Sequence, residues 1–158
     1  MEPAAPETKA RGPVVRIGRA ASRLSGGQCR DLARATVWIV GTRTALYVLP
    51  WRRVSGAFEK AKSGTGPVDW PRAKRTVWAV HTAAKWLLGD RPCLTQALVA
   101  RHFLRRYGVE TELLLGAVRS EGGEVEAHAW LERDGVVVIG GDVSPQKYVR
   151  FRTGGRPA

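Results

Sequence analysis

The segment from Cys93 to Tyr107 constrains the fold of this chain more than any other part of the sequence. Pro92 precedes it, and a proline is well tolerated in the first turn of a helix because its missing N–H is not needed there. Gly108 follows it and supplies the left-handed conformation at which helices often end. The apolar residues between these limits form a stripe too wide for a surface helix: Leu94, Ala97, Leu98, Ala100, Phe103, Leu104 and Tyr107. We therefore predict a helix that is sandwiched between other elements.

The residues after Gly108 follow a strand-like pattern instead. Residues 112–118 form an apolar run typical of a buried strand, and residues 126–132 alternate between two faces. The sequence Arg133-Asp134-Gly135 indicates a hairpin turn, and residues 136–139 form the returning strand.

Two further helices are expected upstream, at about residues 30–49 and 71–88. Pro50 ends the first, and a polar link at residues 62–71 leads into the second. Helices followed by an antiparallel sheet define an α+β fold.

The charge of the chain is strongly positive and unevenly distributed. The formal net charge is +12, made up of +14 over residues 1–108 and −2 over residues 109–158. Such a field attracts an acidic partner, either nucleic acid, an anionic membrane surface or an acidic peptide, or it simply reflects an arginine-rich solvated surface. Because no nucleic-acid-binding motif accompanies the charge, we expect no nucleic-acid partner. Contact with a membrane is not expected either.

Cysteine usage and hydropathy indicate a cytoplasmic protein. Cys29 and Cys93 are too few for a disulfide framework, which suits a reducing compartment. Residues 1–13 contain no apolar run that would serve as a secretory signal. The most apolar stretch, residues 36–50, carries Arg43 and is too short to span a bilayer.

Cys93 is the candidate nucleophile. In the first turn of a helix, unpaired N–H groups and the helix dipole stabilise a thiolate and lower the pKa of the thiol. The same N–H groups could hold the oxyanion of an acyl-transfer intermediate. The alternative is that Cys93 is only a small apolar residue at a helix start.

His128 is the candidate base among three histidines. His102 lies nine residues after Cys93 on the same helix, so it points to the opposite side. His81 lies on a helix rich in aromatic residues, where a core histidine is the simpler interpretation. His128 opens a strand whose sheet must pack against the cysteine helix, so its ring can face Cys93. The alternative is a strand histidine that faces solvent.

Asp142 is the expected orienting group for the base. Asp134 is excluded because it lies in the turn, roughly 20 Å from His128 along an extended strand. A three-residue turn would place Glu132 opposite Val136, and in that register Asp142 lies on the same face as His128, one diagonal step away. A two-residue turn would shift the register by one and turn Asp142 aside.

No metal or cofactor is expected. The cysteines and histidines show no ligand pair at a short, regular spacing, and no glycine-rich loop follows a strand to bind a nucleotide.

Three runs of sequence resemble the lasso-peptide biosynthesis leader peptidases, which belong to the transglutaminase-like superfamily. The runs are residues 93–98 (CLTQAL), 104–109 (LRRYGV) and 127–132 (AHAWLE), the last followed by Asp134-Gly135. The resemblance is closest over residues 72–142 and looser over residues 30–60. It implies a papain-like α+β core in which N-terminal helices and the cysteine-bearing helix pack on an antiparallel sheet.

By this resemblance Cys93 is the nucleophile and His128 the base of a cysteine–histidine–aspartate triad. The aspartate of the family lies about twelve residues after the histidine, where this chain has Gly140. The nearest carboxylate is that of Asp142, which is therefore the expected counterpart.

The resemblance also implies a function and partners. The family removes the leader peptide from a ribosomally synthesised precursor by hydrolysis through an acyl-enzyme. A separate leader-recognition protein would present the precursor peptide, and an ATP-dependent lasso cyclase would act on the product. Two alternatives stay open: an acyl transferase that uses the same triad with an amine acceptor, and a non-enzymatic basic module that binds nucleic acid or anionic surfaces.

We expect four parts along the chain. Residues 1–27 form a largely disordered segment, residues 28–70 a helical N-terminal part, residues 71–152 the transglutaminase-like catalytic core, and residues 153–158 a flexible tail.

Overall fold

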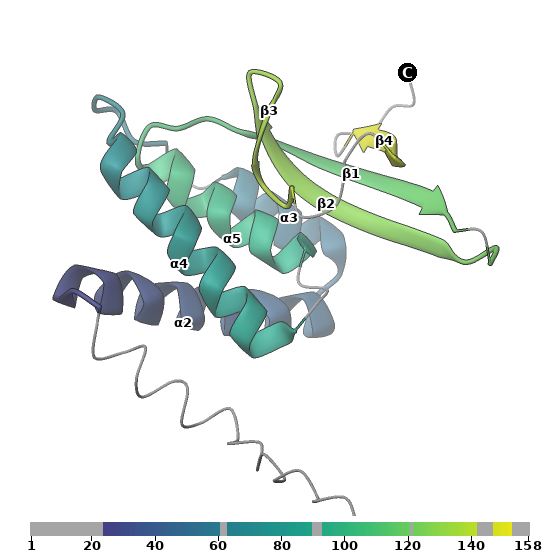
Figure 1. The fold of residues 1–158 in the computed structure, drawn as a ribbon, viewed down its shortest axis with the longest axis horizontal. Coiled ribbons are helices and arrows are strands. Elements are labelled where there is room, and N and C mark those ends of the chain that lie inside the picture. The colour runs from purple at the N-terminus through teal and green to yellow at the C-terminus, as the bar shows by residue number, and fades with distance from the viewer. Residues whose placement is uncertain (1–23, 61–62, 90–92, 121, 142–146, 153–158) are drawn as a thin grey trace, which may run out of the picture.

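The computed structural model describes residues 24–60, 63–89, 93–120, 122–141 and 147–152 (Figure 1). Its elements are the helices α2 (Gly26–Val48), α3 (Trp51–Glu59), α4 (Trp70–Leu88) and α5 (Cys93–Arg106), then the strands β1 (Glu112–Arg119), β2 (Val125–Arg133), β3 (Val136–Ile139) and β4 (Val149–Arg152). This order confirms the α+β fold. Disorder was expected over residues 1–27, but Ser25 caps helix α2 and Gly26 and Gly27 form its first turn, so the helical part begins earlier. Residues 1–23 and the expected flexible tail, 153–158, lie outside the described residues.

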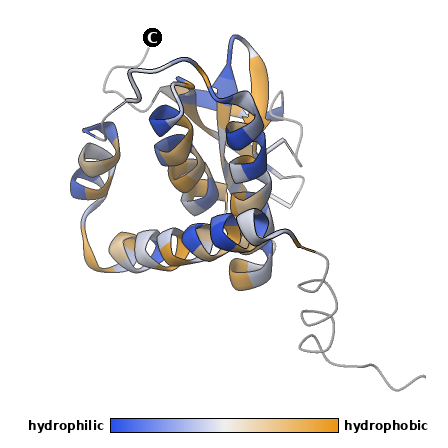
Figure 2. Ribbon diagram, turned by 90° about the vertical axis from the view of Figure 1, so that its left-hand side faces the viewer, coloured by the Kyte–Doolittle hydropathy of each residue, from blue (hydrophilic) through white to orange (hydrophobic). Residues whose placement is uncertain are grey.

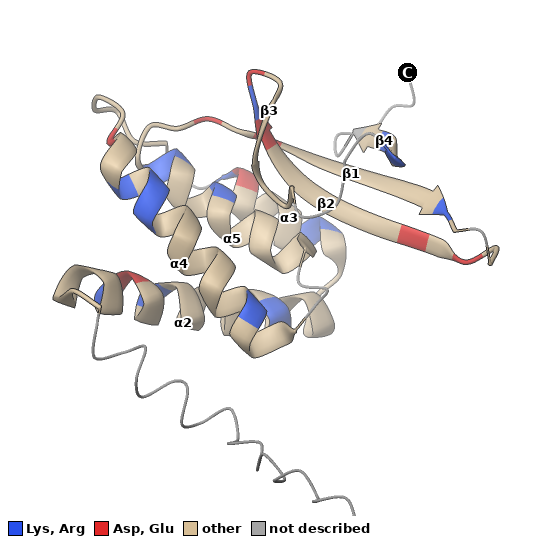
Figure 3. Ribbon diagram, in the orientation of Figure 1, with Lys and Arg blue, Asp and Glu red and all other residues tan. Residues whose placement is uncertain are grey.

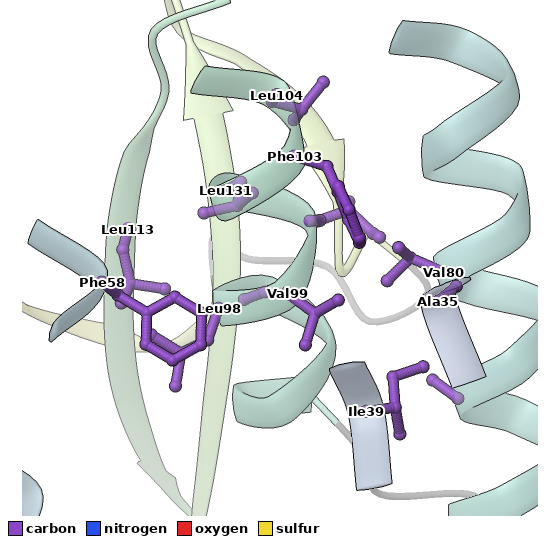
Figure 4. Packing of buried hydrophobic residues seen from close by; sticks show 14 of the residues in the cluster. Ala35, Ile39, Phe58, Val80, Leu98, Val99, Phe103, Leu104, Leu113 and Leu131 are labelled. Atoms are coloured by element: carbon purple, nitrogen blue, oxygen red, sulfur yellow. The ribbon is translucent and has the colours of Figure 1, made fainter. Parts of the chain in front are cut away.

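Helix α5 lies in the middle of the fold, between the other helices and the sheet (Figure 1). It contacts α2 and α4 as well as β1, β2 and β3. Figure 4 shows Leu98, Val99 and Phe103 of α5 among core residues from the helices and the central strands. The prediction of a sandwiched helix is confirmed. The buried residues of α5 are Thr95, Gln96, Ala97, Leu98, Val99, Ala100, Phe103 and Leu104.

Helix α2 begins at Gly26, four residues before the expected start at Arg30. Its first residue is set by a capping box: the Ser25 hydroxyl accepts from the N–H of Gln28 at 3.3 Å, and the Gln28 side chain accepts from the N–H of Ser25 at 2.8 Å. Figure 2 shows apolar residues along much of α2, including its outer surface. Because they lie on several sides of the helix, their spacing locates its ends only roughly.

Pro50 separates two helices. It ends α2, as predicted, but it also stands at the N-cap of α3, which the sequence pattern did not distinguish as a helix of its own. None of the described helices is long and apolar enough to cross a membrane.

Helices α2 and α4 are joined by an ion pair as well as by apolar contacts. Asp31 of α2 is buried, and its carboxylate accepts a hydrogen bond from the Arg75 guanidinium of α4. Helix α4 starts where predicted, because the Asp69 side chain accepts from the N–H of Arg72 at 3.1 Å and Pro71 occupies the first turn.

The strands form one antiparallel sheet in the order β3-β2-β1-β4, of which β4 was not predicted. The helices cover one face of this sheet (Figure 1). The opposite face carries a smaller cluster built on Leu114, Trp130 and Tyr148. Two separate apolar clusters therefore hold β2 from its two faces.

The predicted three-residue hairpin turn is wrong. Asp134 and Gly135 both have positive φ, 50° and 77°, and together they form a two-residue turn that pairs Arg133 with Val136. Residues that accept left-handed φ at both positions favour this turn, because its twist matches that of the strands. A bulge then follows, so that Leu131 lies opposite Ile139.

Candidate active site

Cys93 lies beside the part of the β2 edge that does not pair with strand β3. Strand β3 pairs only with residues 131–133 of β2, so the preceding residues of β2 have no paired strand on that side of the described sheet. The first turn of α5 occupies this place. The backbone N–H groups of Ala129 and Leu94 both donate to the Cys93 sulfur. The expected position of the cysteine at a helix start is confirmed.

His128 lies on the same part of β2, which has no paired strand on this side among the described residues. Its ring forms a hydrogen bond with the Cys93 side chain. Its Nε2 lies 2.7 Å from the carbonyl oxygen of Gly140. A carbonyl oxygen only accepts, so Nε2 carries the hydrogen and donates, which leaves Nδ1 for the sulfur. The structure therefore brings together the two residues that the sequence predicted as nucleophile and base.

The imidazole is held by the aromatic cluster on the outer face of the sheet. The His128 ring stacks on Trp130, with centroids 5.9 Å apart, and on Tyr148, with centroids 5.3 Å apart. Trp130 is fully buried, and its indole N–H donates to Glu132 at 2.8 Å. Glu132 pairs in turn with Arg150 of β4. This chain of contacts limits rotation of the ring.

The electrostatics of the pair favour the charged forms of both groups. Burial raises the pKa of the Cys93 thiol, but hydrogen bonds from His128, Ala129 and Leu94 outweigh burial and lower that pKa. The hydrogen bond with Cys93 raises the pKa of His128, burial opposes this effect, and the Gly140 carbonyl adds to it. Both shifts favour a thiolate beside an imidazolium.

Asp142, the predicted third member, lies outside the described residues. The group observed at Nε2 is instead the backbone carbonyl of Gly140, the residue twelve positions after His128. The family resemblance points to this position, but it implies a carboxylate, which this chain carries only at Asp142. A main-chain carbonyl has no residue type of its own, and only the spacing could have indicated it.

The other two histidines serve different purposes. His102 stacks on Trp38, with centroids 4.0 Å apart, and lies against Phe103, on the side of α5 away from the site. Its exclusion is confirmed. The Nδ1 atom of His81 accepts from the side chain of Gln96 at 2.9 Å. Gln96 is buried one turn after Cys93, so this bond fixes α4 against the cysteine helix.

No group of three or more His, Cys, Asp or Glu side chains in the described part of the chain could hold a metal ion. Cys29 is free and exposed, which makes it a natural internal control for the reactivity of Cys93.

A cysteine at the start of a buried helix, hydrogen-bonded to a histidine on an adjacent antiparallel strand, defines a class of cysteine-dependent acyl-transfer enzymes. The sequence profile of the transglutaminase-like superfamily matches residues 36–153. The chain belongs to this superfamily, whose members are generally cysteine-dependent enzymes. Searches of curated proteins and of solved structures found no significant match.

Proposed function

We propose that this protein is a cysteine endopeptidase that removes the leader peptide from a ribosomally synthesised lasso-peptide precursor. The observation that carries the chemistry is the hydrogen bond between Cys93 and His128, with the pKa of each group shifted toward its charged form. The substrate class rests on the resemblance of residues 93–98, 104–109 and 127–132 to leader peptidases.

In the first half of the reaction, the Cys93 thiolate attacks the carbonyl carbon of the last leader peptide bond. The N–H groups of the first turn of α5 stabilise the oxyanion that forms. The His128 imidazolium then gives its Nδ1 proton to the departing amine, which becomes the new N-terminus of the core peptide. The leader stays on the sulfur as a thioester.

In the second half, water attacks the thioester. Neutral His128 accepts a proton from the water, and the leader leaves with a free carboxylate while the thiolate is restored. The Gly140 carbonyl keeps Nε2 protonated throughout, so Nδ1 is the atom that exchanges the proton.

The charge distribution supports an acidic partner for the helical half. Figure 3 shows Lys and Arg over the helices, whereas Asp and Glu are found mostly on the hairpin side. An acidic leader, or a separate leader-recognition protein that presents it, would dock on this basic side. The ATP-dependent lasso cyclase is the expected consumer of the product.

Mass spectrometry of one incubation tests the proposal. The protein is mixed with a precursor peptide and its recognition protein, and we expect two fragments whose masses sum to precursor plus one water. A leader fragment that ends in an added amine, joined as an amide in place of the free carboxylate, would instead indicate an acyl transferase with the same Cys93 intermediate. An unchanged precursor in the presence of folded enzyme would contradict both chemistries and favour a basic binding module.

Matched variants identify the residues responsible. Cys93→Ala and His128→Ala should abolish cleavage while the circular dichroism spectrum is retained. Cys29→Ala, at the exposed cysteine, should cleave at the normal rate. Normal cleavage by Cys93→Ala would refute the proposed mechanism.

A further inference from the structure

A groove lies between helix α4 and strand β3 and extends to the residue that is hydrogen-bonded to His128. Its volume is about 360 Å³. One wall is formed by Lys74, Val77, Trp78 and His81 of α4, and the other by residues 137–141. Gly140, whose carbonyl accepts the hydrogen bond from His128, belongs to the second wall. The lining of the groove therefore includes a direct hydrogen-bond partner of the His128 imidazole.

The lining suits an apolar side chain. Val77 and Val138 are half-buried, and the Trp78 side chain is 37% exposed. The titratable groups of the lining are Lys74, which is exposed, and His81, which bonds to Gln96. An apolar residue would cover valine and tryptophan surface that now faces solvent, and an acidic neighbour would pair with Lys74.

The backbone of β3 suits an extended peptide. Strand β3 is at the end of the sheet, with no further strand beside it among the described residues. Arg133 and Val136 flank a two-residue turn, so they exchange hydrogen bonds across the hairpin. The N–H and C=O of Val137, the next residue, consequently point to the open edge, and Val137 lines the groove. An unpaired edge of this kind is a template for strand addition.

We infer that this groove binds an extended segment of the peptide substrate, which pairs with Val137 and places an apolar side chain against Trp78. This inference rests on the proposed peptidase function. Continuity with the catalytic pair favours the substrate over any other occupant, because Gly140 both lines the groove and forms the hydrogen bond with His128. The groove would thus select precursors with an apolar residue a short distance from the cleaved bond.

The test measures how fast thiol-reactive peptides alkylate Cys93 in a Cys29→Ser background. One series, N-acetyl-Leu-Leu-Leu-glycyl chloromethyl ketone and its all-glycine analogue, extends from the reactive carbon toward the N-terminus. A second series, chloroacetyl-Leu-Leu-Leu amide and its all-glycine analogue, extends the other way. Iodoacetamide, which has no side chains, corrects every rate for the intrinsic reactivity of the thiolate.

In one of the two series we expect the leucine probe to react on the order of ten-fold faster than the glycine probe. Trp78→Ala should remove most of that preference, and N-methylation of one probe amide should do the same because it blocks pairing with the strand edge. Trp86→Ala is the matched control, since Trp86 lies on the same helix, is 51% exposed and is not part of the groove. It should leave the preference unchanged.

A charge exchange provides a second test that does not depend on the tryptophan. Lys74→Glu should reverse the preference between probes that carry Asp or Lys next to the apolar residue, whereas Lys85→Glu on the same helix should not. The inference would be overturned if leucine preference were absent from both series. It would also be overturned if leucine preference survived Trp78→Ala and the preference between Asp and Lys probes survived Lys74→Glu.

The two proposals fail in different ways. Leucine-selective, Trp78-dependent alkylation without any cleavage of the precursor would keep the groove and reject the peptidase. Normal cleavage of the precursor with unselective alkylation would keep the peptidase and reject the groove.

Discussion

Hydrogen bonds shift Cys93 and His128 toward their charged forms, and the bond between the two side chains contributes most. The N–H groups of Leu94 and Ala129 support the thiolate, and the carbonyl of Gly140 supports the imidazolium. Burial alone would have favoured the neutral thiol and the neutral imidazole. Hydrogen bonding to the charged forms decides the outcome.

The pH dependence of turnover follows from these opposite shifts. The pKa of Cys93 is lowered, so the thiolate persists to lower pH than in a free thiol, and activity is lost only as the pH falls through that lowered value. The pKa of His128 is raised, so the acid that protonates the leaving amine persists to higher pH. We expect a broad bell in kcat/KM against pH. A narrow profile governed by an ordinary thiol would contradict the ion pair.

The thiol and the imidazole should also titrate as a coupled pair. In Cys93→Ala the pKa of His128, followed by NMR of the ring, should fall, because the largest cause of its elevation is removed. In His128→Ala the pKa of Cys93, followed by thiolate absorbance, should rise. The absence of both changes would show that the two groups do not interact in solution.

Gly140→Ala tests the carbonyl that positions the imidazole. Gly140 has a φ of 85°, and an added Cβ would lie 2.9 Å from both the Ala129 oxygen and the Trp130 Cβ. The backbone must shift, so the pKa of His128 should fall and kcat should drop at least ten-fold, with little change in KM. Gly123→Ala is the matched control, with a φ of 83° and no atom within 4 Å of the added Cβ. Equal effects of the two substitutions would indicate backbone strain alone.

The role of Asp142 stays a prediction, which Asp142→Asn tests. If the carboxylate supports the His128 ring, turnover should be severely slowed while Cys93 is still alkylated by iodoacetamide. Full activity would leave the Gly140 carbonyl as the group that orients the ring.

At the scale of the elements, one glycine in the sheet makes room for the aromatic rings that pack against His128. Gly116 of β1 lies opposite His128, and an added Cβ would lie 2.6 Å from the Tyr148 Cβ and 3.0 Å from the Trp130 ring. Only glycine lets both rings pack over β1 and stack on the imidazole.

Gly116→Ala should therefore destabilise the protein by about 1–3 kcal/mol and lower kcat, because the rings that hold His128 must move. Gly41→Ala offers a contrast within α2, where the added Cβ meets no atom within 4 Å. It should instead stabilise the protein by about 0.5–1 kcal/mol. Urea unfolding measures both, and a harmless Gly116→Ala would show that the aromatic cluster is loosely packed.

At the scale of the whole molecule, the ion pair between Asp31 and Arg75 links segments far apart in the sequence. The carboxylate is buried, whereas the Arg75 side chain is 38% exposed. Removing the arginine leaves the buried Asp31 carboxylate without a partner. Removing the carboxylate leaves the Arg75 cation, which water can reach. Arg75→Met should therefore destabilise the protein by about 1–3 kcal/mol, and Asp31→Asn by less. The reverse order in urea unfolding would contradict this account.

Patterns within short stretches of sequence determined most of the fold. The limits of α5 followed from Pro92 and Gly108, its central position from the width of its apolar stripe, and β3 from a short apolar run. These features are local, because helix and strand periods and terminal residues act over a few positions. The candidate nucleophile and the candidate base were predicted in the same way, from the place of Cys93 at a helix start and of His128 on a strand.

The tertiary structure decided what depends on pairing between distant residues. The turn at Asp134-Gly135 and the following bulge set the register of β3, and that register, not the alternation of side chains, brings the Gly140 carbonyl to His128. One residue more or less in a turn leaves the local pattern almost unchanged, yet it moves every later atom by a residue along the strand. Local sequence patterns therefore predicted the Cys93–His128 pair, whereas only the folded chain revealed the carbonyl that orients His128 and the groove that this carbonyl's residue lines.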